Sequence, residues 1–470
     1  MKAVKDSTPS DQLPDIYPDY IGVTIPTDIA PLNFCMNDSL VERIDVVIKG
    51  NKGGELHAQG TASTNLPMEE WKELLRANAG DSLSVTVNAQ RQDGWTTYRT
   101  FGIKVSRDEL DYGLVYRKIA PGYEKYSKMG IYERDLSSFE ERALIENTSF
   151  YGCVNCHEFP QGNPSAMSLH VRGQHGATLL MKDGQLEALE TKTNQTLGSC
   201  VYPYWHPSGR YIAYSTNQTE QTFHVTDKNR IEVYDDASDV QVYDVEQNLL
   251  IAPEVLKNDS VLETYPVFAA DGKALYFCAA TAKEIPEGLK EVRYNLCKID
   301  FNPQDGTFGE RIDTIVNAER NGKSVCFPKP SYDGRFLGYT LADYGTVSIW
   351  HHEADLYLLD LATGENRPLA LANSDDTESY HNWSSNSRWM VFSSRRDDGL
   401  FTRPYICHID ENGRESKPFM LPQENPKAYY RELFLSFNVP AFVTAPVPFT
   451  REEAVKTLLS SQRKQMGVRP

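Results

Sequence analysis

Short apolar runs rich in β-branched residues, each ended by a turn, fill the chain from about residue 20 onward. Residues 44–48 (IDVVI), 82–87 (SLSVTV) and 101–105 (FGIKV) are examples, and glycine turns such as Gly53-Gly54 and Asp93-Gly94 fall between such runs. Runs of this length and composition are typical of strands. They predict a mainly β protein that begins with a small β-sandwich over residues 20–108, interrupted by one amphipathic helix at 67–78.

Three further segments have different patterns. Residues 1–19 are polar and contain Pro9, Pro14 and Pro18, which predicts a flexible tether. Residues 109–175 are rich in tyrosine and charge and are predicted to be a connector. Within it, the apolar positions of 135–147 fit one face of a helix. Residues 446–470 are predicted to be a C-terminal tail.

A repeat organises the second half of the chain. Each copy has an aromatic residue seven positions before a small turn residue, a second aromatic five positions after that turn residue, and a later strand that ends in aspartate. The first aromatics are Tyr202, Tyr265, Phe327 and Tyr380, the turn residues are Gly209, Gly272, Gly334 and Ser387, and the aspartates are Asp244, Asp300, Asp360 and Asp410. One such unit cannot bury both of its faces, so several units must pack around an axis.

The repeat therefore predicts a β-propeller over residues 176–445. Four copies are clear, a weaker unit lies at 165–198, and a sixth would come from the stretch around 434–443, so five or six blades are expected. The aspartates at the strand ends are expected to accept hydrogen bonds from turn backbones.

The repeat pattern, aromatic-Pro-x-Trp/Phe-Ser-x-Asp-Gly-Lys/Arg, resembles that of TolB-type propellers over about residues 200–415. The resemblance implies a rigid platform on which other proteins dock. Some propellers of this kind carry a peptidase domain, but this chain contains no Gly-x-Ser-x-Gly nucleophile elbow.

Charge and cysteine content narrow the classes of partner. The formal net charge of −17 repels phosphate backbones, so nucleic acid is not an expected partner. No run approaches 18 apolar residues. Eight cysteines are too few for a disulfide scaffold in a chain of 470 residues. Cys278 and Cys297 lie in neighbouring strand-like runs and could either pair or remain buried thiols.

The motif that carries chemistry is Cys153-Val154-Asn155-Cys156-His157. This C-x-x-C-H pattern is the attachment signature of c-type haem, in which two thiols bind one porphyrin and the histidine ligates its iron. It predicts covalent haem c on Cys153 and Cys156 with His157 as the proximal metal ligand. A zinc site, a thioredoxin-like redox pair and structural thiols remain as alternatives.

Three residues downstream of the motif are candidates for the distal ligand: Met167, His170 and His175. The stretch from Asn155 to Gly173 resembles a group of TolB-like propeller proteins that carry one C-x-x-C-H motif ahead of the propeller. That resemblance implies His170 as the distal metal ligand, with Met167 as second choice, and Arg172 as a partner for a haem propionate.

Other histidines are weaker candidates. His351, His352 and Glu353, with Asp355 nearby, include residue types that bind metals. His206 and His381 fall within the repeats and are expected to be structural.

These observations predict an extracytoplasmic monohaem cytochrome c on a propeller scaffold. It would relay electrons or serve as the haem-bearing subunit of an envelope complex, with a redox partner protein and no catalytic residues of its own. Covalent haem requires export, yet the written N-terminus has no apolar leader. We therefore expect a missing leader, which could be lipid-anchored, and a periplasmic or envelope-associated location. The alternative is a haem-free, TolB-like docking propeller of the envelope. An enzyme is the third class and would need an open iron site.

Overall fold

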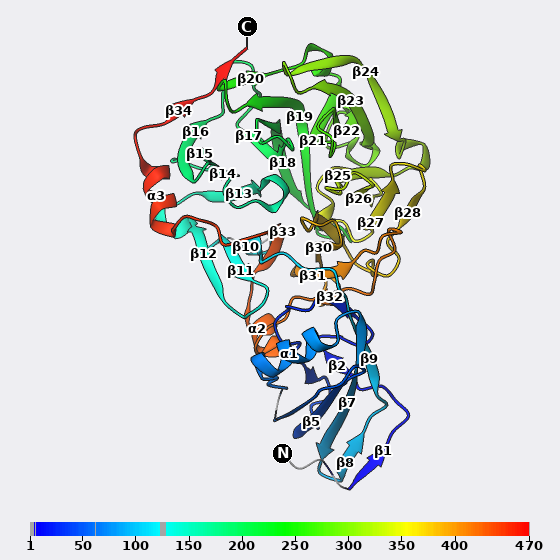
Figure 1. Cartoon of the computed structure of the whole chain (residues 1–470). Coiled ribbons are helices and arrows are strands. Elements are labelled where there is room, and N and C mark those ends of the chain that lie inside the picture. The colour runs from blue at the N-terminus through cyan, green and yellow to red at the C-terminus, as the bar shows by residue number, and fades with distance from the viewer. Residues whose placement is uncertain (1–3, 5, 62, 123–127, 470) are drawn as a thin grey trace.

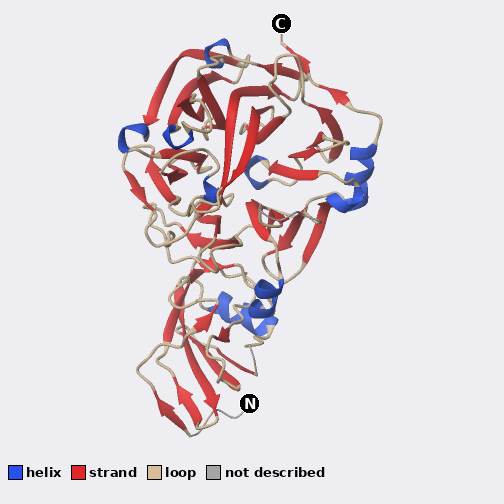
Figure 2. Ribbon diagram, turned by 180° about the vertical axis from the view of Figure 1, so that it is seen from behind, coloured by secondary structure: helices blue, strands red, loops and turns tan. Residues whose placement is uncertain are grey.

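The computed structural model describes residues 4, 6–61, 63–122 and 128–469. It has two parts, a smaller N-terminal domain and a larger ring of sheets (Figure 1). Figure 2 shows from behind that strands make up most of both parts, whereas the longer helices lie at the rim of the ring or between the parts. Among the described residues, no helix is both long enough and apolar enough to cross a bilayer.

A seven-stranded sheet forms the N-terminal domain, and helix α1 (Met68–Ala77) packs on it through Trp71, Leu74 and Leu75. The Trp71 indole donates a hydrogen bond to the Ile29 carbonyl at 3.0 Å. The helix predicted at 67–78 is confirmed. The strands are β1 (Ser7–Pro9), β3 (Thr24–Ile25), β5 (Arg43–Gly50), β6 (Glu55–Gly60), β7 (Asp81–Arg91), β8 (Gly94–Thr97) and β9 (Phe101–Val105), with β2 (Ile16–Tyr17) and β4 (Cys35–Met36) in a two-stranded sheet.

The segment predicted to be a flexible tether, residues 1–19, is part of the fold wherever the structure describes it. Strand β1 pairs in parallel with β8, and the Tyr17 hydroxyl donates to the Asp397 carboxylate at 2.9 Å. Ile16 and Tyr20 are buried in a core that this domain shares with the ring. Apolar residues between the prolines explain the difference, because their burial outweighs the turn-forming tendency of the segment.

The ring is a six-bladed β-propeller, in agreement with the predicted fold class. Blade one contains β10 (Gly113–Ile119), β11 (Gly130–Asp135), β12 (Glu141–Glu146) and β33 (Ser436–Val443). Blade two contains β13 (Cys153–Glu158), β14 (Met167–Arg172), β15 (Ala177–Lys182) and β16 (Gln185–Glu190). Blade three contains β17 (Cys200–Trp205), β18 (Tyr211–Phe223), β19 (Ile231–Asp244) and β20 (Leu249–Ile251).

The other three blades follow the same order. Blade four contains β21 (Val261–Phe268), β22 (Ala274–Thr281), β23 (Asn295–Asn302) and β24 (Thr307–Val316). Blade five contains β25 (Ser324–Pro330), β26 (Phe336–Ala342), β27 (Asp355–Asp360) and β28 (Asn366–Pro368). Blade six contains β29 (Glu378–Trp383), β30 (Trp389–Ser394), β31 (Arg403–His408) and β32 (Phe419–Met420). Short 3-10 turns are η1 (Asn147–Ser149), η2 (Pro160–Gly162), η3 (Glu254–Leu256), η4 (Leu289–Glu291), η5 (Glu319–Asn321) and η6 (Ser348–Trp350).

The ring closes on blade one, where β33 near the C-terminus pairs antiparallel with β10. The predicted connector at 109–175 therefore contains strands of blades one and two, so the propeller starts earlier than expected. The helix predicted at 135–147 is wrong, because 141–146 form β12. Leu144 and Ile145 are adjacent and both buried, because helix α3 (Arg451–Leu459) covers the strand from one side. Because α3 buries residues on one side of β12, the apolar residues of this run have a spacing that resembles that of a helix.

The predicted tail also joins the propeller. Helix α3 (Arg451–Leu459) starts with a capping box between Thr450 and Glu453. Strand β34 (Lys464–Gln465) then adds to the outer edge of blade two, and β35 (Gly467–Val468) adds to that of blade three. Helix α2 (Pro426–Glu432) precedes β33. These additions pair outer edges of two blades, which would otherwise be open.

Candidate binding site on the propeller axis

Four aromatic residues of the repeat form an arc around the propeller axis. Tyr202, Tyr265 and Phe327 have φ of 51°, and Tyr380 has φ of 52°. Each lies where the innermost strand of its blade shifts register. Such a bulge re-aims a side chain, and left-handed backbone costs a non-glycine residue roughly 1–2 kcal/mol. The repeat therefore places its aromatic residue in a strained bulge that faces the centre.

The rings of the arc touch in sequence. Ring centroids are 4.6 Å apart for Tyr202 and Tyr265, 4.2 Å for Tyr265 and Phe327, and 4.8 Å for Phe327 and Tyr380. Blades one and two break the arc, because their corresponding bulge residues are Val439 and Asn155. The arc therefore has an apolar side and a polar opening.

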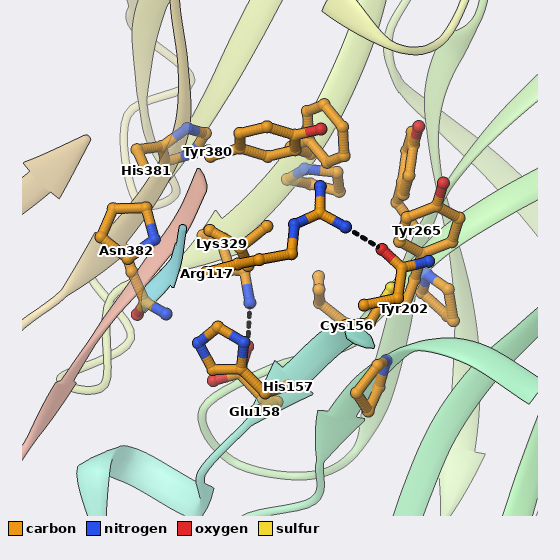
Figure 3. Close-up of a pocket in the computed structure, with 18 residues that line it drawn as sticks. Arg117, Cys156, His157, Glu158, Tyr202, Tyr265, Lys329, Tyr380, His381 and Asn382 are labelled. Atoms are coloured by element: carbon orange, nitrogen blue, oxygen red, sulfur yellow. Dashed lines mark hydrogen bonds and ion pairs between the residues drawn. The ribbon is translucent and has the colours of Figure 1, made fainter. Parts of the chain in front are cut away.

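Arg117 lies at that opening (Figure 3). Its Nη1 donates to the Asn155 Oδ1 at 2.6 Å, whereas its Nε is buried without a hydrogen-bond partner among the described residues. Lys329 and Glu158 form an ion pair on the same wall, and Glu158 is buried. The enclosed space is about 90 Å³, and 18 residues line it.

The C-x-x-C-H segment is the innermost strand of blade two, not a helix. Its register shift places Cys156 and His157 at the positions that Pro203 and Tyr204 hold in blade three. Cys156 is buried and lines the pocket, and burial raises the pKa of its thiol. Cys153 is half-buried at the start of the strand. All eight cysteines are free thiols, so the Cys278–Cys297 pairing does not occur.

Both predicted metal ligands are buried and neutral. His157 Nε2 lies 3.2 Å from the Val115 carbonyl of blade one, and burial lowers its pKa to about 4. His170 Nδ1 lies 3.4 Å from the Thr178 hydroxyl, and burial lowers its pKa to about 3. Each imidazole is therefore an uncharged part of the blade packing at neutral pH.

The two histidines cannot ligate one iron atom. His157 is paired with Leu169 across β13 and β14, so His170, the next residue along β14, points to the other face of the sheet. Ser168 shares the face of His170, and its hydroxyl lies 2.7 Å from that of Tyr214 in blade three. His157 instead faces blade one. The sheet therefore separates the predicted proximal ligand from the predicted distal ligand.

The other predicted haem contacts fit no better. Met167 is fully buried in the core between blades one and two, and Arg172 is exposed at the end of β14. His175 is half-buried beyond the strand. A pocket of about 90 Å³ is also smaller than the ~300–1,000 Å³ typical of sites for larger ligands. The residues of this fold do not fit covalent haem with the predicted ligands.

The remaining predicted residues are structural where the structure shows their contacts. His206 Nε2 lies 3.0 Å from the Gly272 carbonyl and so ties blade three to blade four. Asp244, Asp360 and Asp410 accept hydrogen bonds from turn backbones, as predicted. Within the described part of the chain, no group of three or more His, Cys, Asp or Glu side chains is arranged to hold a metal ion.

Sequence reasoning missed the charged residues of the pocket. Arg117 lies on β10, within the predicted connector, so nothing marked it as an axial residue. Glu158 directly follows the motif, and Lys329 replaces an apolar residue two positions after the repeat aromatic Phe327. That replacement was the available signal, because the second copy has Val267 at the same place.

Comparisons with known proteins give distant similarities that carry no argument about this chain. No family model and no curated protein matches the chain. A DUF4784 family protein from Bacteroides caccae is 10% identical, with 77% of this chain and 95% of that chain covered and a TM-score of 0.33. The periplasmic gluconolactonase of Pseudomonas aeruginosa is 14% identical, with 84% and 99% covered and a TM-score of 0.34. Prolyl oligopeptidase B from Galerina marginata is 10% identical over 71% of this chain, with a TM-score of 0.37.

This chain spans 42% of the length of prolyl oligopeptidase B. Such low identities and TM-scores carry no argument about activity or ligand. The TolB resemblance accordingly remains one of repeat pattern. What is established is the architecture: a six-bladed β-propeller preceded by a β-rich N-terminal domain.

Proposed function

We propose that this protein is a haem-free binding propeller whose axial pocket takes a small ligand that carries a carboxylate. The observation that supports this is the charge of the pocket wall. Among the residues described there, the lone carboxylate, Glu158, is already paired with Lys329, whereas Arg117 faces no acidic partner. The pocket wall therefore carries one net positive charge.

The donor geometry of Arg117 favours a carboxylate. A guanidinium has five N–H donors in a planar fork that matches the two oxygens of a carboxylate. Asn155 accepts from Nη1, and the buried Nε has no partner among the described residues. A buried donor without a partner costs roughly 1–3 kcal/mol, so an anion in this place would recover that cost.

The pocket limits the size of the ligand. A cavity of ~150 Å³ can hold benzene, so about 90 Å³ suits an acid of only a few heavy atoms. The aromatic arc would pack against its apolar part. An acidic side chain of a partner protein presents the same carboxylate, which keeps the predicted docking role open as a second source of this chemistry.

Calorimetric titration with acetate, lactate and succinate tests the proposal, using the intact chain and the variant Arg117→Gln. Arg335→Gln is the matched control, because Arg335 is exposed on blade five. Loss of a hydrogen bond to a charged group costs ~1.5–3 kcal/mol, so Arg117→Gln should weaken binding at least about tenfold. Acidic peptides form a second arm: binding by peptides but not by free acids would identify docking.

Two results would contradict the proposal. One is equal binding by the wild-type chain and Arg117→Gln. The other is no binding of any free acid or acidic peptide at millimolar concentration.

The predicted export, lipid-anchored leader and redox partner depended on covalent haem. The ligand geometry removes that support, so these remain predictions about location and partners without a structural argument behind them.

A further inference from the structure

The hairpin of β18 and β19 extends far beyond blade three. Strand β17 pairs with β18 only as far as Thr216, whereas β18 and β19 remain paired from Asn217–Ser238 out to Phe223–Ile231. We call residues 217–238 the arm. The long strands of this hairpin stand out in the ring in Figures 1 and 2.

The tip of the arm is fixed to blades four and five. The buried Glu232 carboxylate accepts from the Tyr344 hydroxyl and lies 2.9 Å from His351 Nε2. Asn229 accepts from the His352 backbone at 3.1 Å. Lys290 of the η4 turn in blade four pairs with Asp227 at 2.6 Å. These contacts hold the arm in place, so it forms a fixed wall for the space beside it.

It encloses a cavity of about 580 Å³ between the arm, blade five and blade six. The lining residues are Phe223, His224, Lys228, Arg230, Ile231, Trp350, His352, Arg395, Gly399 and Leu400. The volume lies within the ~300–1,000 Å³ typical of small-molecule sites.

The lining is basic although the chain carries a net charge of −17. It has three cationic side chains, Lys228, Arg230 and Arg395, two imidazoles and, among the described residues, no aspartate or glutamate. Lys228 pairs with Glu353 at 3.1 Å, and His352 pairs with Asp376 at 3.3 Å. These pairings hold the Lys228 and His352 side chains in place.

Three more features point to a ligand. The buried Nε2 of His224 has no hydrogen-bond partner among the described residues. Phe223 is 56% exposed beside it. Arg395 lies 4.2 Å over the Trp350 ring, which holds its guanidinium in one orientation. A ring nitrogen with no hydrogen-bond partner in the described part of the chain, cationic side chains and exposed apolar surface suit an anion with an organic body.

We propose that this cavity binds a phosphate or sulfate ester of a small organic molecule such as a sugar. Arg230 and Arg395 would hold the anionic group, because guanidinium forks match tetrahedral oxyanions. Phe223, Ile231 and Leu400 would cover the organic part. A bare anion would leave most of the cavity empty, so the ester should bind more tightly than the free ion.

Calorimetric titration of the intact chain separates the sources of the anion. The probes are glucose 6-phosphate, glucose 6-sulfate, inorganic phosphate and glucose. We expect one ester to bind more tightly than inorganic phosphate, glucose to show no binding, and affinity to fall as salt is added.

Arg230→Gln should weaken ester binding at least about tenfold. Arg320→Gln, at an exposed arginine of blade four, should leave it unchanged, and so should Arg117→Gln, which tests the axial pocket separately. Equal binding by glucose, equal loss in Arg320→Gln, or no ester binding at millimolar concentration would overturn the proposal. Arg230 is exposed, so its substitution should not impair folding.

Discussion

His157 and His170 lie on opposite faces of blade two, although the strands that carry them are neighbours. One faces the Val115 carbonyl of blade one, and the other faces the Thr178 hydroxyl within its own sheet. Neighbouring strands are ~4.8 Å apart, and the two imidazoles project from opposite faces of this sheet, so one iron atom cannot bind both of them. This relationship argues against His157 and His170 as a pair of ligands to one iron atom.

The first prediction is that the chain binds no covalent haem. Exported behind a leader in a host with c-type maturation, the purified protein should give no pyridine haemochrome signal. The physical reason is that the sheet separates His157 from His170, and that Met167, which shares the His157 face, is fully buried between blades one and two. The variant Cys153→Ser/Cys156→Ser is the control and should look the same as wild type. A covalent haem signal that this variant loses would show that blade two is arranged differently.

The second prediction concerns the buried ion pair of the axial pocket. Lys329→Met should destabilise the protein by ~3–5 kcal/mol, because it leaves the buried Glu158 carboxylate without its partner. Adding Glu158→Gln should restore most of this loss. The measurement is denaturant unfolding of the single and double variants.

Lys49→Met is the matched control, since Lys49 pairs with Glu55 on the surface, where a pair contributes less than about 1 kcal/mol. Equal effects at the two lysines would contradict the burial argument.

The third prediction concerns the strained backbone of Val439, the blade-one residue that interrupts the aromatic arc. Val439 has φ of 51°, which is unfavourable for a β-branched residue, whereas asparagine tolerates this region. Val439→Asn should therefore stabilise the protein by about 1 kcal/mol in denaturant unfolding. The same change at Val316, a half-buried residue at the end of β24, should destabilise it. Destabilisation at both positions would mean that side-chain packing at Val439 outweighs backbone strain.

The fourth prediction is a pH dependence caused by Glu263. This side chain is 3% exposed, and its burial, with a smaller effect of Asp239, raises its pKa to about 9. The folded chain therefore holds a proton that the unfolded chain releases above about pH 4.5. The resulting stabilisation is complete below that pH and is lost as the pH rises toward 9.

Glu263→Gln should remove this loss. Between pH 5 and pH 8 the variant should gain up to ~4 kcal/mol relative to wild type, at about 1.4 kcal/mol per pH unit. Unfolding by denaturant at the two pH values measures the difference. Glu284→Gln, at an exposed residue, should show no such gain. A parallel pH response of wild type and Glu263→Gln would contradict the assignment.

The sequence pattern predicted those elements whose structure depends on residues close together in the chain. The repeat aromatics and turn glycines revealed the propeller, because each blade needs the same bulge and the same tight turn. Helix α1 followed from a stretch whose apolar face packs on one sheet. Blade one was predicted only as a sixth unit from the stretch around 434–443, which contains β33, and its other three strands, β10 to β12, were missed because they lie about 300 positions earlier in the chain.

The site could be predicted only in part. The motif drew attention to Cys156 and His157, which do line the axial pocket. Its spacing suggested haem, because two thiols three positions apart can bind one porphyrin and the next histidine can ligate its iron. In a bulged strand the same spacing carries no such meaning. Arg117 could not be placed from the sequence at all, since its position on the axis depends on ring closure.

That closure also has a consequence for synthesis on the ribosome. Blades two to six can assemble as the chain emerges, but blade one waits with three strands until β33 leaves the exit tunnel. Val439 and Pro440 arrive with it, so the axial pocket is completed only after residue 440 has been made. A ribosome that stalls before residue 436 would therefore leave the edge of β10 unpaired and prone to aggregation, and the axial pocket would not form.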